Sequence, residues 1–121
     1  MIPAIKAIEI VESPGLSPDS FTPDDKADFV CTFGLTIGPA GSDGGELFYI
    51  TVCSPTRLEQ LCERDGFVWG RHRLIVPYFD FDKIRSIMTK FVSNCGGETW
   101  QEIAPKIARL GAWEFEDYIA L

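Results

Sequence analysis

The sequence predicts an α+β fold, with a mostly antiparallel sheet of about four to five strands covered on one face by roughly two to three helices. Two β-prone runs, Phe29–Ile37 and Leu47–Cys53, flank a glycine-rich loop and indicate an antiparallel hairpin. The clearest helical stripe lies much later, within residues 84–95. Strands therefore concentrate in the first half of the chain and helices in the second, a segregation typical of α+β proteins.

The predicted hairpin forms the centre of the sheet. Apolar side chains of Phe29–Ile37 fall at odd positions and share one face, because side chains alternate along a strand. In Leu47–Cys53, one set consists of Phe48, Ile50 and Val52, and the other of Leu47, Tyr49, Thr51 and Cys53. The loop between the runs is rich in glycine and holds Pro39, so it cannot continue either strand.

Two further strands flank a long linker and a helix. Ile5–Val11 is short and β-branched, and in Phe67–Phe79 Leu74 and Val76 alternate with Arg73 and Ile75. Pro77 places this later strand at a sheet edge or at its own end. The linker, residues 13–28, holds three prolines and four aspartates, and Phe21 is expected to pin it to the body.

Capping signals mark three helices. Ser54-Pro55 starts the first, which Gly66 ends. Asp80 caps the second, and Thr99 with Glu102 forms a capping box for the third. The second helix has a stripe of six apolar residues at helical spacing. These residues are Ile84, Ile87, Met88, Phe91, Val92 and Cys95.

The end of the chain is harder to predict. Pro105 lies inside the third helix, where it removes a hydrogen bond and crowds the preceding turn, so we expect a kink or a break. After Gly111, Trp113 and Phe115 alternate with Glu114 and Glu116. This alternation permits a short strand, and a helical turn is nearly as compatible with it.

Length and composition restrict the class of protein. With 121 residues, the chain is expected to form one domain, residues 1–121. Its net charge of −7 argues against nucleic acid as a partner, because phosphate binding needs clustered Lys and Arg. Neither a signal peptide nor a membrane-spanning run is visible, so no membrane partner and a cytoplasmic location are expected. The four cysteines lack metal-site spacing and are expected to be small buried hydrophobes.

The acidic charge is uneven. From Glu9 to Glu46 there are eight acids and one base, Lys26. Such an excess can serve solubility alone, or it can steer a basic partner. For the second case, the candidate partner-binding residues are Asp24, Asp25, Asp28, Asp43 and Glu46.

The chain offers little catalytic chemistry, and we predict no catalytic residue, no metal and no cofactor. Its one histidine, His72, would need a nucleophile and an orienting group, which the sequence does not place beside it. Asp43 and Glu46 do not match the spacing of a calcium loop. An alternative partner-binding surface, suited to an acidic partner, is formed by Trp69, Arg71, His72 and Arg73.

Four motifs resemble the immunity protein 8 family of bacterial polymorphic and contact-dependent toxin systems. They read IGPAGSDGGELFYITVCSP, FVWGRHRLIV, ETWQEIA and WEFEDY, in this order, and the resemblance covers about residues 5–118. It implies a cytoplasmic protein that binds and blocks a cognate toxin domain, with no enzyme activity or cofactor. The acidic charge suggests that this toxin is basic, as a nuclease would be.

Two other classes stay open from the sequence alone. One is a small enzyme that uses His72 with a cysteine. The other is an adaptor or assembly subunit that pairs through a sheet edge, and the sequence does not predict the oligomeric state.

Overall fold

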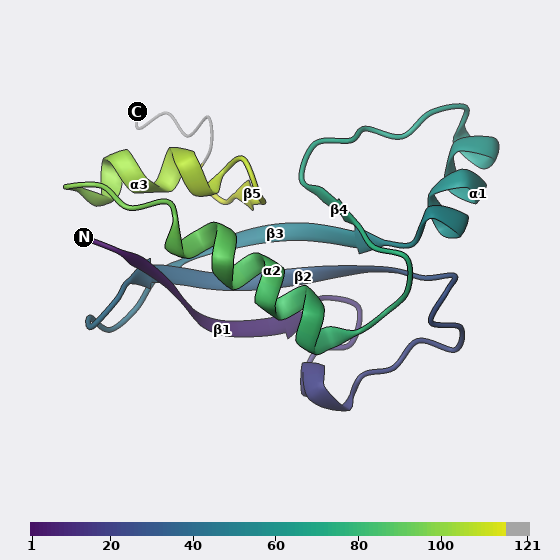
Figure 1. The fold of residues 1–121 in the computed structure, drawn as a ribbon, viewed down its shortest axis with the longest axis horizontal. Helices are drawn as coiled ribbons and strands as arrows, with labels where there is room; N and C mark the ends of the chain where they lie inside the picture. The colour runs from purple at the N-terminus through teal and green to yellow at the C-terminus, as the bar shows by residue number, and fades with distance from the viewer. Residues whose placement is uncertain (116–121) are drawn as a thin grey trace.

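The structure is a computed structural model, and it describes residues 1–115. Its sheet contains β1 (Pro3–Ile10), β2 (Val30–Pro39), β3 (Glu46–Cys53), β4 (Arg73–Ile75) and β5 (Ala112–Trp113). The strand order is β1-β2-β3-β4, and β5 also pairs with β3 (Figure 1). Three of the four pairings are antiparallel, so the predicted α+β class with a mostly antiparallel sheet is confirmed.

The β2–β3 hairpin is the centre of the sheet, as its alternation predicted. Phe33 pairs with Ile50, and Leu35 pairs with Phe48, in an unbroken antiparallel register. All four side chains are essentially inaccessible to solvent. β1 extends the sheet beyond β2, with one register irregularity around Lys6.

The edge of β3 that faces away from β2 carries two short strands. β4 pairs in parallel with the end of β3, and β5 pairs antiparallel with Phe48 and Tyr49 earlier in the same strand. The predicted strand Phe67–Phe79 is therefore wrong in length, because only Arg73–Ile75 reaches β3. Its predicted alternation holds, since Val76 is buried while Ile75 is exposed. As predicted, the strand lies at an edge and ends before Pro77.

The three helices begin where the capping signals place them. They are α1 (Pro55–Asp65), α2 (Phe81–Ser93) and α3 (Trp100–Ile107). In each case the side chain of the residue before the helix accepts a backbone N–H of the first turn. Gly66 ends α1 with a positive φ of 83°, a conformation that glycine adopts without a Cβ penalty.

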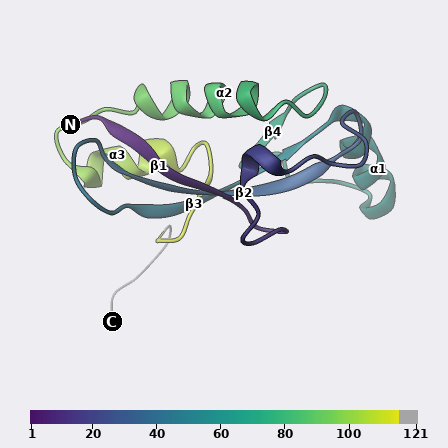
Figure 2. The same ribbon diagram turned by 90° about the horizontal axis from the view of Figure 1, so that it is seen from below.

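Two helices cover one face of the sheet. α2 crosses above the strands and α3 lies on the same side, while α1 stands beyond the end of β3 (Figures 1 and 2). α2 buries Ile84, Met88 and Val92 against the core. Two other residues of its apolar stripe, Ile87 and Phe91, are 36% and 37% exposed.

α3 runs through Pro105 and ends at Ile107, so the predicted break at the proline is wrong. The helix has only eight residues and Pro105 lies in its last turn, so a single intrahelical donor is lost. Ile103 and Ile107 are fully buried and hold the helix on the core. Trp100 contacts Phe48 edge to face, with ring centroids 6.5 Å apart.

The linker is ordered by one short 3-10 helix, η1 (Pro18–Ser20), and by the predicted contact of Phe21. The rings of Phe21 and Phe79 meet edge to face at 5.4 Å, and the backbone N–H of Phe79 donates to the carbonyl of Lys26. The linker therefore packs against the chain that leads into α2. At the other terminus, β5 confirms a short strand in the tail, while Glu116 and the residues after it lie outside the described part.

Candidate interaction surfaces

The linker acids lie at the end of the sheet where α1 stands. Asp24 and Asp25 are exposed. The carboxylate of Asp28 is already engaged within the protein, because it accepts hydrogen bonds from Arg57 Nε at 2.7 Å and from Gln60 Nε2 at 3.0 Å. The bond from Gln60 and then that from Arg57 lower the pKa of Asp28 below its ordinary value. Asp28 thus joins the linker to α1, and Asp24 and Asp25 are left as the acids directed to solvent.

The other two predicted acids lie at the hairpin tip. Asp43 is exposed on the loop between β2 and β3. Glu46 begins β3, and its Oε2 accepts the indole N–H of Trp113 at 2.7 Å. Beside it, Glu114 accepts the backbone N–H of Leu47, so two carboxylates join β5 to the start of β3.

The structure does not bring the two groups of acids together. The linker group precedes the first residue of β2, and the tip group follows its last residue (Figure 1). The ten residues of β2, at about 3.3 Å each, separate the groups by roughly 30 Å. They therefore form two acidic regions at opposite ends of the sheet.

A recess with acidic walls opens beside the linker. Its volume is about 280 Å³, and its lining includes Asp19, Tyr78 and Asp82 together with Lys26. Tyr78 is 52% exposed and follows the end of β4. Tyr78 is not among the residues predicted from the sequence, although an aromatic residue directly after Pro77 at a predicted edge is a usable signal.

Exposed apolar side chains gather on the connection from α1 to α2. Phe67 is 62% exposed, Trp69 79%, Ile75 49% and Tyr78 52%. The predicted alternative surface included Trp69 but omitted Phe67, which the incorrect strand prediction had placed in the sheet. The connection and the linker lie at the same end of the molecule as α1 (Figure 1).

His72 serves the fold of this connection. Among the non-glycine residues that the structure describes, His72 alone has a positive φ, 58°. Its backbone carbonyl accepts the N–H of Thr51. Its Nε2 lies 2.6 Å from the carbonyl oxygen of Ala108, to which the Nε2–H tautomer donates, and 3.2 Å from Arg71 Nε, from which the other tautomer accepts. Arg73 Nε donates to the carbonyl of Trp69, which fixes the loop further.

The thiols are in settings that disfavour nucleophilic chemistry. All four cysteines are free, and Cys62 alone is less than fully buried. Burial raises the pKa of the Cys31 thiol to about 12, and burial also raises the pKa of Cys95. The Cys53 thiol lies against Arg73 Nη1, and the Cys95 thiol donates to the Phe91 carbonyl. Among residues 1–115, no cluster of three or more potential metal ligands occurs.

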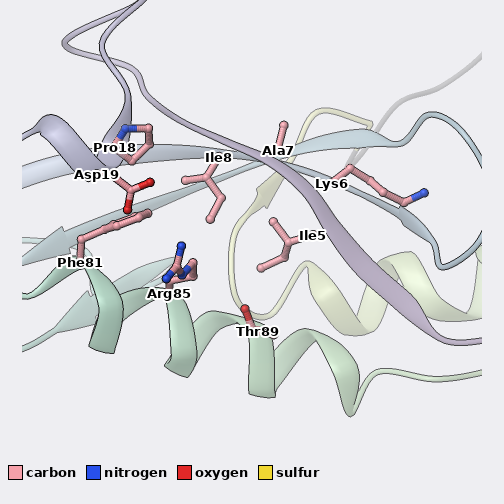
Figure 3. A pocket seen from close by; sticks show the side chains of 9 residues that line it. All are labelled: Ile5, Lys6, Ala7, Ile8, Pro18, Asp19, Phe81, Arg85 and Thr89. Atoms are coloured by element: carbon pink, nitrogen blue, oxygen red, sulfur yellow. The ribbon is translucent and has the colours of Figure 1, made fainter.

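A second recess, of about 290 Å³, lies at the free edge of β1 (Figure 3). Ile5, Ile8 and Phe81 give it apolar walls. Its guanidinium is already engaged, because Arg85 lies over the Phe81 ring and pairs with Asp82 at 2.9 Å. The register irregularity at Lys6 and the neighbouring η1 are features that protect an edge strand from further pairing.

These features describe an α+β protein, and its described residues offer candidate surfaces for association. A family model described as Immunity protein 8 matches residues 4–118. The chain belongs to the immunity protein 8 family. No curated protein and no solved structure matches the chain. Within the described residues, no helix is both long and apolar enough to cross a membrane.

Proposed function

We propose that this protein neutralises a cognate antibacterial toxin by stoichiometric binding in the cytoplasm, without catalysis and without a cofactor. The observation that carries the proposal is the family match over nearly the whole chain. The burial of three of the four free cysteines and the contact of His72 with a backbone carbonyl support it, because these side chains then have a role in the fold that needs no catalysis. We further propose that the toxin is the C-terminal domain of a larger secreted protein.

The net charge of −7 favours a basic toxin surface. A nuclease fits this requirement, since an enzyme that binds a polyanion carries clustered Lys and Arg. A carboxylate surface placed over such a site speeds association and competes with the nucleic acid. We therefore propose a nuclease as the toxin class.

We propose that the linker end is the contact surface, with Asp24 and Asp25 as its exposed acids. The recess lined by Asp19 and Tyr78 lies beside them and offers a place for a Lys or Arg side chain of the toxin. Asp28 contributes by holding the linker against α1 through Arg57. Asp43 and Glu46, at the opposite end, are assigned only a long-range electrostatic contribution.

Matched charge reversals test this assignment. The double variant Asp24→Lys/Asp25→Lys reverses the charge of two acids at the linker end. The control variant Asp43→Lys/Glu98→Lys changes the net charge equally at the other end. All four of these side chains are exposed. The probe is the C-terminal domain encoded immediately upstream, and the measurement is stopped-flow association at several salt concentrations. The linker variant should associate about tenfold more slowly with a shallower salt dependence, and the tip variant within about twofold of wild type.

Equal effects of the two variants would contradict the linker-end assignment. Failure of the wild-type protein to bind the toxin domain, or to rescue cells that co-express it, would contradict the proposed function. A His72→Ala variant that binds normally yet no longer protects cells would point to an enzyme instead, because binding alone would then be insufficient.

A further inference from the structure

The helices leave one face of the sheet open. α2 and α3 lie on one side of the strands, α1 stands beyond their end, and no described helix lies on the other side (Figure 2). Because side chains alternate along a strand, this face carries the residues between those that form the core. In β2 and β3 these residues are Thr32, Gly34, Thr36, Leu47, Tyr49 and Thr51. We call this surface the open face.

One row of residues across the open face has a glycine at its centre. Glu9 of β1 pairs with Gly34, and Gly34 pairs with Tyr49 on its other side. The three residues share one face, because directly paired residues of adjacent strands point the same way. A Cβ on Gly34 would lie 2.9 Å from Glu9 Oε1 and 3.1 Å from Glu9 Cγ. The Glu9 side chain therefore lies across the sheet over Gly34, with its carboxylate directed along the row toward Tyr49.

Glu9 is the charged strand residue without a partner. The described strands contain four charged residues, which are Lys6, Glu9, Glu46 and Arg73. Lys6 and Arg73 each donate to a backbone carbonyl. Glu46 accepts the indole N–H of Trp113. Glu9 is exposed, and within residues 1–115 its carboxylate forms neither a hydrogen bond nor an ion pair.

The acids that border the open face are engaged as well. Glu12 accepts the backbone N–H of Thr32 at 2.8 Å, and Glu114 accepts that of Leu47 at 2.9 Å. The six residues that follow Phe115 contain no Lys or Arg. Glu9 is therefore the carboxylate of this face that is left for a cation from another molecule.

Tyr49 offers an aromatic surface beside that carboxylate. Its neighbours across the strands are Gly34, which has no side chain, and Ala112, which has only a methyl group. Neither neighbour can cover the ring, and Tyr49 is only partly buried. A carboxylate next to an uncovered aromatic ring matches a guanidinium, which forms two parallel hydrogen bonds with a carboxylate and stacks on aromatic faces. The ammonium group of lysine offers neither the fork nor the planar stack.

We propose that the open face binds an arginine side chain of the cognate toxin. Its guanidinium pairs with Glu9 and stacks on Tyr49, above Gly34. This inference rests on the proposed function, because it takes the toxin as the partner. It adds to the linker end a second contact, which requires one particular basic side chain on the toxin.

The open face and the linker end are close enough to belong to one interface. Gly34 is four residues from Val30, where β2 begins, which corresponds to about 13 Å. The linker directly precedes the start of β2. A protein interface of ordinary size covers about 800 Å² on each partner, which is wide enough to include both contacts. A single docked toxin domain can therefore reach the linker acids and Glu9 together.

Glu9→Gln tests the inference by titration calorimetry against the toxin domain encoded immediately upstream. The amide keeps the shape of the side chain and removes its charge, so binding should weaken about 30-fold, as loss of one partner of a charge pair does. The matched control is Glu98→Gln, which removes the same charge from an exposed residue between α2 and α3 and should stay within about twofold. Because Glu9 is exposed and makes no hydrogen bond, its variant should keep the wild-type melting temperature.

Variants of Tyr49 test the stacking surface. Tyr49→Phe keeps the ring and should bind within about twofold of wild type. Tyr49→Thr removes the ring and keeps a residue that favours strands, so it should bind about tenfold more weakly. Circular dichroism checks that this variant is folded. If it is not, Glu9→Gln still decides the inference, because that substitution changes no packed side chain.

Alanine substitutions of the toxin's Lys and Arg residues identify the bound side chain. Each substitution is measured against wild-type protein and against Glu9→Gln. One arginine substitution should weaken binding to the wild-type protein and have little further effect on binding to Glu9→Gln, because the two changes remove the same contact.

Four results would contradict these expectations. Toxin binding that is equal for wild type and Glu9→Gln would overturn this inference and leave the proposed function standing. Equal weakening by Glu98→Gln would also overturn it, because the effect would then belong to net charge. Coupling of Glu9 to a lysine and to no arginine would overturn the choice of side chain. No binding of the toxin domain by the wild-type protein would overturn the proposed function, and this inference with it.

Discussion

Ser54 should be the polar residue on which the fold depends most, and Ser54→Ala is the substitution that tests this. The side chain is fully buried. Its Oγ accepts the N–H of Arg57 at 3.3 Å, which caps α1, and also the N–H of Phe29 at 3.1 Å, which joins the linker to β3. Loss of an N-cap costs about 1 kcal/mol, and an unsatisfied buried N–H costs about 1–3 kcal/mol. Ser54→Ala should therefore lower the free energy of unfolding by about 3 kcal/mol.

Urea denaturation followed by circular dichroism measures this change. For 121 residues, an unfolding entropy of about 2.1 cal/mol/K per residue converts 3 kcal/mol into a drop of about 12 °C in melting temperature. Ser93→Ala is the matched control, because Ser93 is exposed and donates only to the Lys90 carbonyl within α2. The control should change stability by less than about 0.5 kcal/mol. A loss below about 1 kcal/mol for Ser54→Ala would refute the claim that its two hydrogen bonds act as described.

Two further predictions concern the hairpin and the thiols. Gly38→Ala should cost about 1–3 kcal/mol in urea denaturation, because its Cβ would stand 2.4 Å from the Gly44 carbonyl oxygen, whereas Gly70→Ala, with open space around the Cβ, should be close to neutral. Native protein should be alkylated by iodoacetamide first at Cys62, while Cys31 should react only after unfolding. Because burial raises the pKa of Cys31 from 9.0 to about 12, its contribution to stability should be complete below pH 9 and be lost as the pH rises toward 12. A Cys31→Ser variant with an unchanged alkaline unfolding midpoint would contradict that assignment.

The local signals in the sequence were sufficient for most elements. Ser54, Asp80 and Thr99 each cap the helix that they were expected to cap, since a capping side chain acts on backbone atoms only a few residues away. The alternation of the β2–β3 hairpin predicted its buried face, because period-2 geometry is set within each strand. These features depend on residues that are close in the sequence, so they can be predicted without knowledge of the fold.

The predictions that failed depended on distant partners. Whether Phe67–His72 is strand or loop depends on how much of β3 is left for pairing, and β5 occupies part of that edge. Ile87 and Phe91 match the apolar period of α2, yet they are 36% and 37% exposed. Helical spacing records which residues share a side but not how wide the opposing surface is.

The candidate surfaces divide in the same way. The acidic excess and the separate Trp69–Arg73 cluster were visible in the sequence. Their spatial relation was not, because β2 carries Asp28 and Asp43 to opposite ends of the sheet. The hydrogen bonds that occupy Asp28 and His72 also come from residues far along the chain, so the sequence could not separate these two residues from the exposed members of their groups.

By itself, the sequence determined the α+β class, the helix starts, the central hairpin and the family resemblance, because these are encoded by local patterns and ordered motifs. Only the tertiary structure decided that the linker and the connection from α1 to α2 meet at the same end of the molecule. It also decided that Trp69 lies in solvent while Trp100 and Trp113 pack against the core. The physical reason is that burial and proximity are set by strand register and by the area of each packed face, which no local pattern contains.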